Sequence, residues 1–456
     1  MNQAMTASER RATTAIGSIM SLRMLGLFMI LPVFALYAQQ LPGVTPTLVG
    51  LAIGIYGLTQ GLLQIPFGML SDRFGRKPVI TVGLLIFVVG SVIAALATDI
   101  HGVIVGRALQ GSGAISAALM ALTADLTREE HRTKAMAVLG MSIGGAFLLA
   151  LISGPILSHW IGVPGTFWLI AVLALLAIGI LYLWVPTPVH SRHHRDAEPV
   201  PAQFLRALQD TQLLRLNFGI FSLHTQLTAL FVVMPLLLRD AGLAQAQHWL
   251  VYLPVMVVAM VAMVPLIILA EKRRLMKPIF SAAIFLLVLT QLGLLALHQG
   301  LLALVMGLLL FFIAFLFLES SLPSLVSKTA PPDSKGTALG VYATTQFLGA
   351  FAGGLGGGWL HQHYGVSALF AACLLLNVLW LSVALTMRKP SYLSNYLLNI
   401  GPITAPQAKL LCQELLQVSG VAEAIVICED GVAYLKVDHK YLDLSALDQY
   451  AVAPEN

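Results

Sequence analysis

The sequence predicts an all-α polytopic membrane protein that ends in a small C-terminal α+β domain. Of its 456 residues, 58% are hydrophobic and only 10% are charged, whereas soluble globular proteins carry about 25% charged residues. The charged residues gather in short segments between long apolar runs, so most of the molecular surface must face lipid rather than water. After Arg388 the apolar runs stop and shorter alternating segments follow, which is typical of a separate water-exposed domain.

The apolar runs predict the number and the form of the membrane crossings. A helix needs about 20 apolar residues to cross a bilayer, and helices satisfy the backbone of such continuous runs within lipid. Twelve runs meet this length. We expect spans at residues 14–38, 47–70, 78–98, 101–124, 133–157, 165–186, 211–238, 247–270, 278–298, 301–326, 336–360 and 366–388.

Lysine and arginine residues predict how these spans are oriented. They fill alternate connecting segments and are nearly absent from the others, with Arg239 as the exception. Because basic loops stay in the cytoplasm, this alternation places both termini there. The net charge of +5 therefore reflects membrane topology, and we expect a lipid bilayer and no nucleic acid as partner. The first apolar run contains Arg23 and is longer than the core of a signal peptide, so we interpret it as a retained span.

The chain divides into two similar halves joined by a polar connection. The charged loop Asp72–Pro78 aligns with Lys272–Pro278 in the second half, and repeated halves of this kind are common in multi-span membrane proteins. We therefore expect an N-terminal six-helix bundle over residues 1–186, a cytoplasmic linker over 187–210, a second six-helix bundle over 211–389 and a cytoplasmic domain over 391–456.

The C-terminal segment predicts a small ferredoxin-like domain. Asp-Gly at positions 430 and 431 separates two alternating runs, which is a hairpin signal. Strand-like and helix-like runs follow the order β-α-β-β-α. The expected elements are strands at Tyr392–Ile400, Ala424–Cys428 and Val432–Val437 and helices at Thr404–Val418 and Leu444–Tyr450.

This C-terminal segment contains thiol and imidazole groups, but not in a metal-binding arrangement. Cys412, Cys428 and His439 are scattered and form no C-x-x-C pair. We therefore expect no metal and no cofactor. We favour a regulatory role, in which the domain binds a ligand or associates with a second copy of itself.

The loop after the second span carries the most specific motif of the chain. Residues 68–78 read G-M-L-S-D-R-F-G-R-K-P, which resembles the G-x-L-x-D-R-x-G-R-K-P pattern of the major facilitator superfamily. Gly68 and Gly75 allow close helix approach and a tight turn, and a carboxylate such as Asp72 is stabilised by the positive end of a helix. The resemblance covers the twelve spans and implies the major facilitator fold, with two six-helix bundles.

The resemblance also implies that this motif is a conformational latch. It implies that Asp72 meets the start of the eleventh span near Gly336, and that Arg76 meets Asp125 at the end of the fourth span. The implied latch residues are Gly68, Asp72, Arg73, Gly75, Arg76, Lys77 and Asp125. The alternative is an ordinary basic loop, which would need neither the aspartate nor the glycines.

Two further motifs of the family are present in whole or in part. Arg107 lies in the run R-A-L-Q-G-S-G of the fourth span, and the resemblance associates this arginine with proton coupling. An arginine at membrane depth is costly and indicates function, although backbone carbonyls of a neighbouring helix could satisfy it. The antiporter motif of the fifth span is partial, because Gly144, Gly154 and Pro155 are present while Ala150 stands where glycine is usual. Helix-packing glycines explain these residues nearly as well.

Three more polar residues are expected at membrane depth. Arg23, His224 and Glu319 lie in the first, seventh and tenth spans, which line the cavity in this family. Glu319 is the candidate proton carrier, because a buried carboxyl can exchange its proton near neutral pH. His224 could share that proton or bind substrate. The alternative for each residue is a satisfied interhelical hydrogen bond or ion pair.

Together these features imply a transporter rather than an enzyme. The chain contains no G-x-x-x-x-G-K-[ST] phosphate-binding loop and no evident nucleophile–base arrangement. The resemblance implies a bacterial inner-membrane protein that exchanges protons for an exported small molecule or drug by alternating access. One alternative is a proton symporter that imports a sugar or similar metabolite. Another is a membrane sensor that signals through the C-terminal domain.

Overall fold

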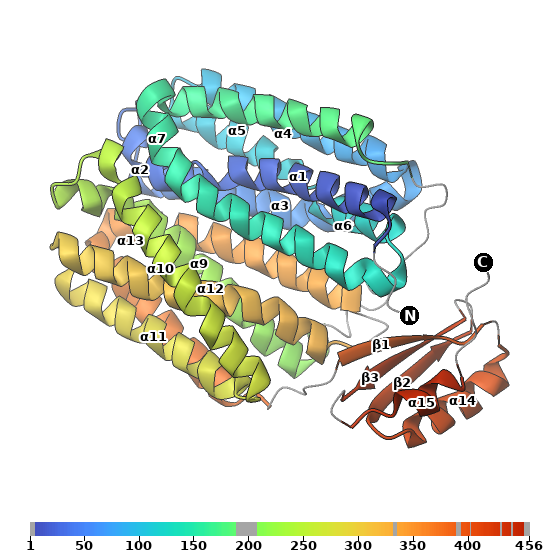
Figure 1. The fold of residues 1–456 in the computed structure, drawn as a ribbon. Helices are drawn as coiled ribbons and strands as arrows, with labels where there is room; N and C mark the ends of the chain where they lie inside the picture. Colours follow the sequence, from blue (N-terminus) through green and yellow to red (C-terminus); the bar gives the residue numbers. More distant parts are fainter. Residues whose placement is uncertain are drawn as a thin grey trace.

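The computed structural model describes residues 5–187, 208–331, 335–388, 394–401, 403–428, 431–438 and 441–450. Within them, ten helices are long and apolar enough to cross a membrane. Two of these, α7 and α13, each contain one glycine with non-helical geometry, Gly162 (φ 70°) and Gly365 (φ 80°). Figure 1 shows α7 reversing its direction. Ten helices with two reversals correspond to the twelve predicted crossings. The linker predicted at 187–210 lies mostly outside the described residues.

The membrane helices form two bundles that follow each other in the chain (Figure 1). The first half comprises α1 (Ala7–Phe28), α2 (Leu31–Ala38), α3 (Pro46–Phe74), α4 (Arg76–Leu96), α5 (Ile100–Ser112), α6 (Ser116–Asp125) and α7 (Glu129–Leu183). The second half comprises α9 (Thr211–Asp240), a 3-10 turn (Gln245–Gln247), α10 (Trp249–Lys272), α11 (Met276–Leu297), α12 (Leu301–Thr329) and α13 (Lys335–Leu385). Within the halves, α7 packs on α1 and α4, and α13 packs on α9 and α11. Between the halves, α3 packs on α13, and α2 packs on α9.

We name the two ends of the helix bundle by their loops. The basic end carries the loops at residues 72–78 and 272–278, and the distal end is the opposite one. The C-terminal domain lies beyond the basic end (Figure 1).

The first and fourth spans, predicted as continuous, each consist of two helices. The first begins at Ala7, earlier than predicted, because Thr6 and Glu9 form a capping box ahead of the apolar run. The fourth is interrupted between α5 and α6, where the backbone at Gly113 leaves the helical conformation. Arg23 Nη2 donates to the carbonyl oxygen of Gly113 at 3.0 Å. The Gly113 carbonyl also accepts from the Ile115 backbone N–H at 2.9 Å, so Arg23 supplies a second donor at the interruption.

The C-terminal domain is a three-stranded antiparallel sheet covered by two helices. Its elements are β1 (Ser394–Asn399), α14 (Ala405–Gln417), β2 (Val421–Ile427), β3 (Val432–Val437) and α15 (Leu444–Asp448). The strand order is β1-β3-β2, with β3 in the centre. Leu398, Leu415 and Leu435 belong to its separate hydrophobic core. The second strand starts earlier than predicted, because a bulge between Val421 and Glu423 continues the pairing past a break in the alternation.

Candidate functional site

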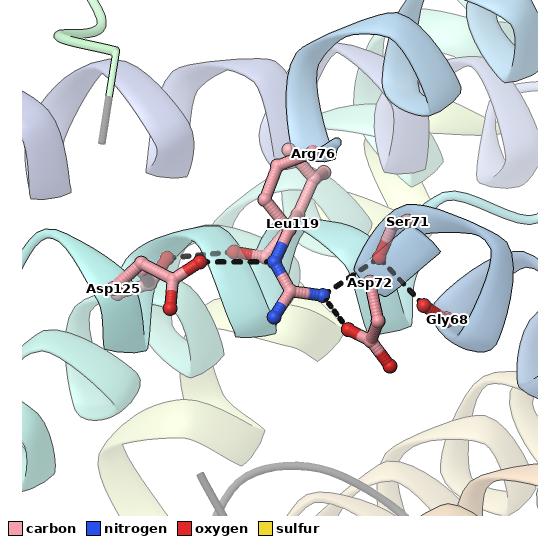
Figure 2. Close-up of polar contacts among 7 residues, drawn as sticks. Gly68, Ser71, Asp72, Arg76, Leu119 and Asp125 are labelled. Carbon is pink, nitrogen blue, oxygen red and sulfur yellow. Dashed lines mark hydrogen bonds and ion pairs between the residues drawn. The ribbon is translucent and has the colours of Figure 1, made fainter. Parts of the chain in front are cut away.

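The loop between α3 and α4 brings two carboxylates to one arginine. Gly75, with φ 90°, ends α3 and lets α4 begin directly at Arg76. Arg76 Nε donates to Asp125 Oδ2 at 2.9 Å, while its Nη1 contacts Asp72 and donates to Ser71 Oγ at 2.8 Å. Figure 2 shows the guanidinium lying between the two carboxylates. The side chain of Asp125 is fully buried at the C-terminal end of α6. The helix dipole disfavours a negative charge there, and Arg76 supplies a compensating charge.

The other residues of this loop are held by neighbouring helices or face solvent. A Cβ at Gly68 would lie 3.3 Å from Ala117 of α6, so α3 and α6 approach closely there. Lys77 Nζ donates to the carbonyl oxygen of Val185, just after the end of α7, at 2.6 Å. Arg73 is exposed, with its guanidinium 5.4 Å from the neighbouring aromatic ring. The loop is therefore joined to the rest of its own half.

Asp72 has an exposed carboxylate in this arrangement. Its side chain is 37% exposed, and its hydrogen bond among the described residues goes to Arg76 of its own half. The predicted contact with the start of α13 near Gly336 is not among the hydrogen bonds of the described residues. In the predicted latch this contact forms when the halves close at the basic end, so it stays a prediction.

A polar cluster in the second half joins three helices. His224 Nε2 of α9 lies 3.0 Å from Glu319 Oε2 of α12. The side-chain amide nitrogen of Gln346 in α13 lies 2.7 Å from His224 Nε2 and 2.9 Å from Glu319 Oε1. Phe315 lies beside the His224 ring and also beside Phe147 of α7, so the cluster adjoins the interface with the first half. Glu319 remains 33% exposed, which gives the cluster access to its surroundings.

Arg23 and Arg107, the arginines expected at membrane depth in the first half, lie in the interior of their own bundle and apart from this cluster. Arg23 is 1% exposed, donates to Ser116 Oγ at 3.0 Å and contacts the side-chain oxygen of Gln60. Arg107 is equally buried and donates to Gln110 Oε1 at 2.8 Å and to the Ala52 carbonyl oxygen at 3.4 Å. The sequence grouped Arg23 with the cavity residues, but its helix turns it toward α3 and α6. Neutral oxygen atoms thus accept much of the hydrogen bonding that the two guanidinium groups can donate.

The residues of the partial antiporter motif differ in how closely other helices pack against them. A Cβ at Gly154 would lie 2.5 Å from the carbonyl oxygen of Met29, so α7 there touches the break between α1 and α2. Pro155 accepts a hydrogen bond from Ser158 Oγ at 3.1 Å. A Cβ at Gly144 would meet nothing within 4 Å. Packing in this conformer therefore requires a glycine at position 154 and not at position 144.

The C-terminal domain keeps its thiols apart from one another. Cys412 Sγ donates to the Ala424 carbonyl oxygen at 3.1 Å, and Cys428 is half-buried at the end of β2. His439 lies outside the described residues. Among the residues that the structure describes, no three His, Cys, Asp or Glu side chains lie close enough together to hold a metal ion.

The halves are joined at the distal end by polar contacts that the sequence did not predict. Arg239, the exception to the charge alternation, donates to Gln39 Oε1 at 2.5 Å across the halves and forms an ion pair with Asp240. The Thr47 backbone nitrogen donates to Gln362 Oε1 at 3.2 Å. The signal for Arg239 was present in the sequence, since a lone basic residue among uncharged loops required an explanation.

Glycines bring α3 and α13 into backbone contact along the same interface. A Cβ at Gly50 would lie 2.0 Å from the Gly354 carbonyl oxygen, and one at Gly358 would lie 2.4 Å from the Pro46 carbonyl oxygen. Such distances admit no side chain on either helix. The halves are therefore closely packed at the distal end in this structure.

Comparison with known proteins identifies the family. A profile of the Major Facilitator Superfamily matches residues 16–354. The chain belongs to the Major Facilitator Superfamily. Over 447 residues it is 47% identical to the inner membrane transport protein YajR of Escherichia coli K12, a match that covers 98% of each chain. The family and the fold expected from the motif loop are confirmed.

More distant members share the fold. The multidrug resistance protein MdtH of Aeromonas salmonicida is 26% identical over 346 residues, which cover 74% of this chain and 85% of that protein. The crystal structure of the human organic anion transporter MFSD10 superposes with a TM-score of 0.63 at 20% identity, covering 83% of this chain and 100% of that one. A bacterial homologue of the lysosomal transporter Spinster, inward-facing and occupied, superposes with a TM-score of 0.70 at 14% identity, covering 83% and 97%. The protein is thus a multi-pass membrane transporter and not an enzyme.

Proposed function

We propose that this transporter exchanges protons for an exported small molecule by alternating access, and that Glu319 carries the proton. The observation that carries the proposal is the cluster of Glu319, His224 and Gln346 beside the interface of the halves. A carboxyl at this position is partly exposed beside the interface, so movement of the halves would change its exposure.

The hydrogen bond between His224 and Glu319 can persist when the pair gains or loses a proton, because the two groups exchange the roles of donor and acceptor. With Glu319 protonated, its hydroxyl donates to His224 Nε2 across the 3.0 Å separation. With Glu319 ionised and its proton released, neutral His224 in the Nε2–H tautomer donates to the carboxylate instead. The Gln346 amide, as oriented in this structure, donates to Glu319 Oε1 at 2.9 Å. A proton carrier needs a partner in both protonation states, and the geometry of this pair supports that.

We propose export rather than uptake as the direction. The partial antiporter motif in α7 supports export, because Gly154 and Pro155 occupy its positions. A relative named for multidrug resistance, MdtH, supports the same direction. We further propose that the basic end faces the cytoplasm of a bacterial inner membrane, because the lysines and arginines gather there and the relative YajR is an inner membrane protein.

The experiment uses purified protein in proteoliposomes with an imposed pH gradient. A thermal-shift screen against metabolites and drugs first supplies a transported compound. Flux of that compound should run opposite to the proton gradient, and Glu319→Gln should make the flux independent of the gradient. Glu271→Gln is the matched control, because Glu271 pairs with Lys328 in the same half, 2.7 Å away and outside the cluster.

Three outcomes would contradict parts of this proposal. Flux in the same direction as the proton gradient would indicate the symporter. Gradient-driven flux in Glu319→Gln equal to that in Glu271→Gln would remove Glu319 as the carrier. Loss of all flux on deleting residues 391–456, with the membrane part still folded, would indicate a protein that works through its C-terminal domain.

A further inference from the structure

The second basic loop, at residues 272–278, has a turn that differs from that of the first. The first loop turns at Gly75, with φ 90°, but the second copy has Leu275 at the aligned position. Its left-handed residue is Arg274, with φ 54°, and Leu275 N donates to the Ala270 carbonyl oxygen at 2.9 Å in a Schellman-type helix end. Glycine is the usual residue at this position because a side chain is strained there. Among the described residues, Arg274 is the one non-glycine residue with positive φ.

The strained arginine reaches the C-terminal domain. Arg274 Nη2 donates to Asp438 Oδ1 at 2.9 Å and to Asp438 Oδ2 at 3.1 Å. Asp438 directly follows β3, and its own backbone is held at both sides, by N–H donation to the Gly420 carbonyl at 2.8 Å and by acceptance from the Tyr441 N–H at 2.9 Å. These two backbone hydrogen bonds fix the position from which Asp438 presents its carboxylate.

The same loop also holds the helix from which the C-terminal domain emerges. Lys277 Nζ donates to the carbonyl oxygens of Leu385 at 2.9 Å and Met387 at 2.6 Å, at the end of α13. Its counterpart Lys77 makes the equivalent bond to Val185 after α7 in the first half. The lysine contact is thus shared by both copies of the loop, whereas the contact of Arg274 is particular to the second copy.

We propose that Arg274, on the loop at residues 272–278, docks the C-terminal domain onto the second half, with Asp438 as its partner. The first copy of the loop contains the aspartate and glycines of the family motif. The second copy lacks them and binds the C-terminal domain through a basic residue instead. Arg274 binds the C-terminal domain itself, and Lys277 binds the end of α13, the helix of the second half from which the domain emerges. The C-terminal domain is therefore carried by the second half when the two halves move.

The test measures the distance between the domain and the second half in the full-length protein. Spin labels are placed on exposed Lys272 and on exposed Leu410 of α14, in a background without the three native cysteines. Double electron–electron resonance is recorded in liposomes for wild type, Arg274→Glu, Asp438→Arg and the double reversal. Arg274→Gly is a further variant that should fold at least as well as wild type, since glycine relieves the strained φ.

The matched control is Arg273→Glu, which makes the same charge change one residue away. Arg273 is exposed and has no hydrogen bond or ion pair through its side chain among the described residues. An exposed ion pair changes an equilibrium by up to about fivefold, so we expect Arg274→Glu and Arg274→Gly to raise the undocked fraction about fivefold. The double reversal should restore the wild-type distance distribution, and Arg273→Glu should keep it.

Several results would overturn the proposal. A wild-type distribution in both Arg274 variants would show that the arginine does not hold the domain. An equal effect of Arg273→Glu would show that general charge attraction, not this pair, is responsible. Failure of the double reversal to restore the distribution would remove Asp438 as the partner.

Discussion

Replacing Gly354 with alanine tests whether the approach of α3 and α13 holds the distal end closed. A Cβ on Gly354 would lie 2.5 Å from the Gly50 carbonyl oxygen and 2.9 Å from the backbone of Gly54. Real Cβ atoms essentially never come within 3.0 Å of such atoms, so the helices must separate by about half an ångström. Gly356 lies on the same helix, and a Cβ there would meet nothing within 4 Å, which makes Gly356→Ala the control.

The size of the conformational shift depends on which conformer carries the steric penalty of the added Cβ. Overpacking a well-packed interface costs about 1–3 kcal/mol, and only the conformer closed at the distal end contains this contact. A penalty of about 1–3 kcal/mol on one conformer shifts the equilibrium about 5- to 150-fold away from it. In Gly356→Ala the gain of helix propensity, about 1 kcal/mol, applies to every conformer in which α13 is helical and shifts nothing.

Spin labels on Gln40 and Gln247 report this equilibrium, because both residues are exposed at the distal end of different halves. We expect Gly354→Ala to populate longer label distances in liposomes, and Gly356→Ala to retain the wild-type distribution. If Gly354→Ala gives the same distribution as Gly356→Ala, the glycine contacts do not determine closure of the distal end.

Two further predictions concern polar groups. Asp72→Asn should reduce transport sharply with expression and melting temperature unchanged, because a carboxylate at a helix N-terminus contributes about 0.3–2 kcal/mol to the conformer closed at the basic end. Normal flux in proteoliposomes would remove the latch from the mechanism. Asn377→Ala should lower the melting temperature, because Asn377 and Gln226 exchange hydrogen bonds of 2.7 and 2.8 Å in a fully buried position. Leaving part of the Gln226 amide unpaired costs about 1–3 kcal/mol, so a melting temperature like that of exposed Ser382→Ala would contradict this account.

Much of the fold followed from local properties of the sequence. The length of an apolar run decides whether it crosses the membrane, and this needs no knowledge of its neighbours. The turn of the motif loop could likewise be predicted, because it depends on Gly75 and a few neighbouring residues. The predicted approach of Arg76 to Asp125 is found at 2.9 Å, although the sequence could not show that Ser71 joins them.

The faces of the helices could not be read from the sequence. In a helix that is apolar all round, periodicity does not show which side meets lipid and which side meets another helix. Arg23 was therefore grouped with His224 and Glu319, whereas the packing of α1 turns it toward Gln60 in the interior of the first half. The contact between Arg239 and Gln39 joins residues that are far apart in the chain, so only their packing reveals it.

The sequence by itself determined the number of crossings, the alternation of charge along the chain and the presence of the motif loop, because each depends on composition or on neighbouring residues. Only the tertiary structure decided which polar side chains meet, which glycines are in backbone contact and where the C-terminal domain docks. Those properties depend on how two halves of similar helices pack against each other. When the helices are of nearly uniform hydrophobicity, the shapes of their surfaces determine how they pack.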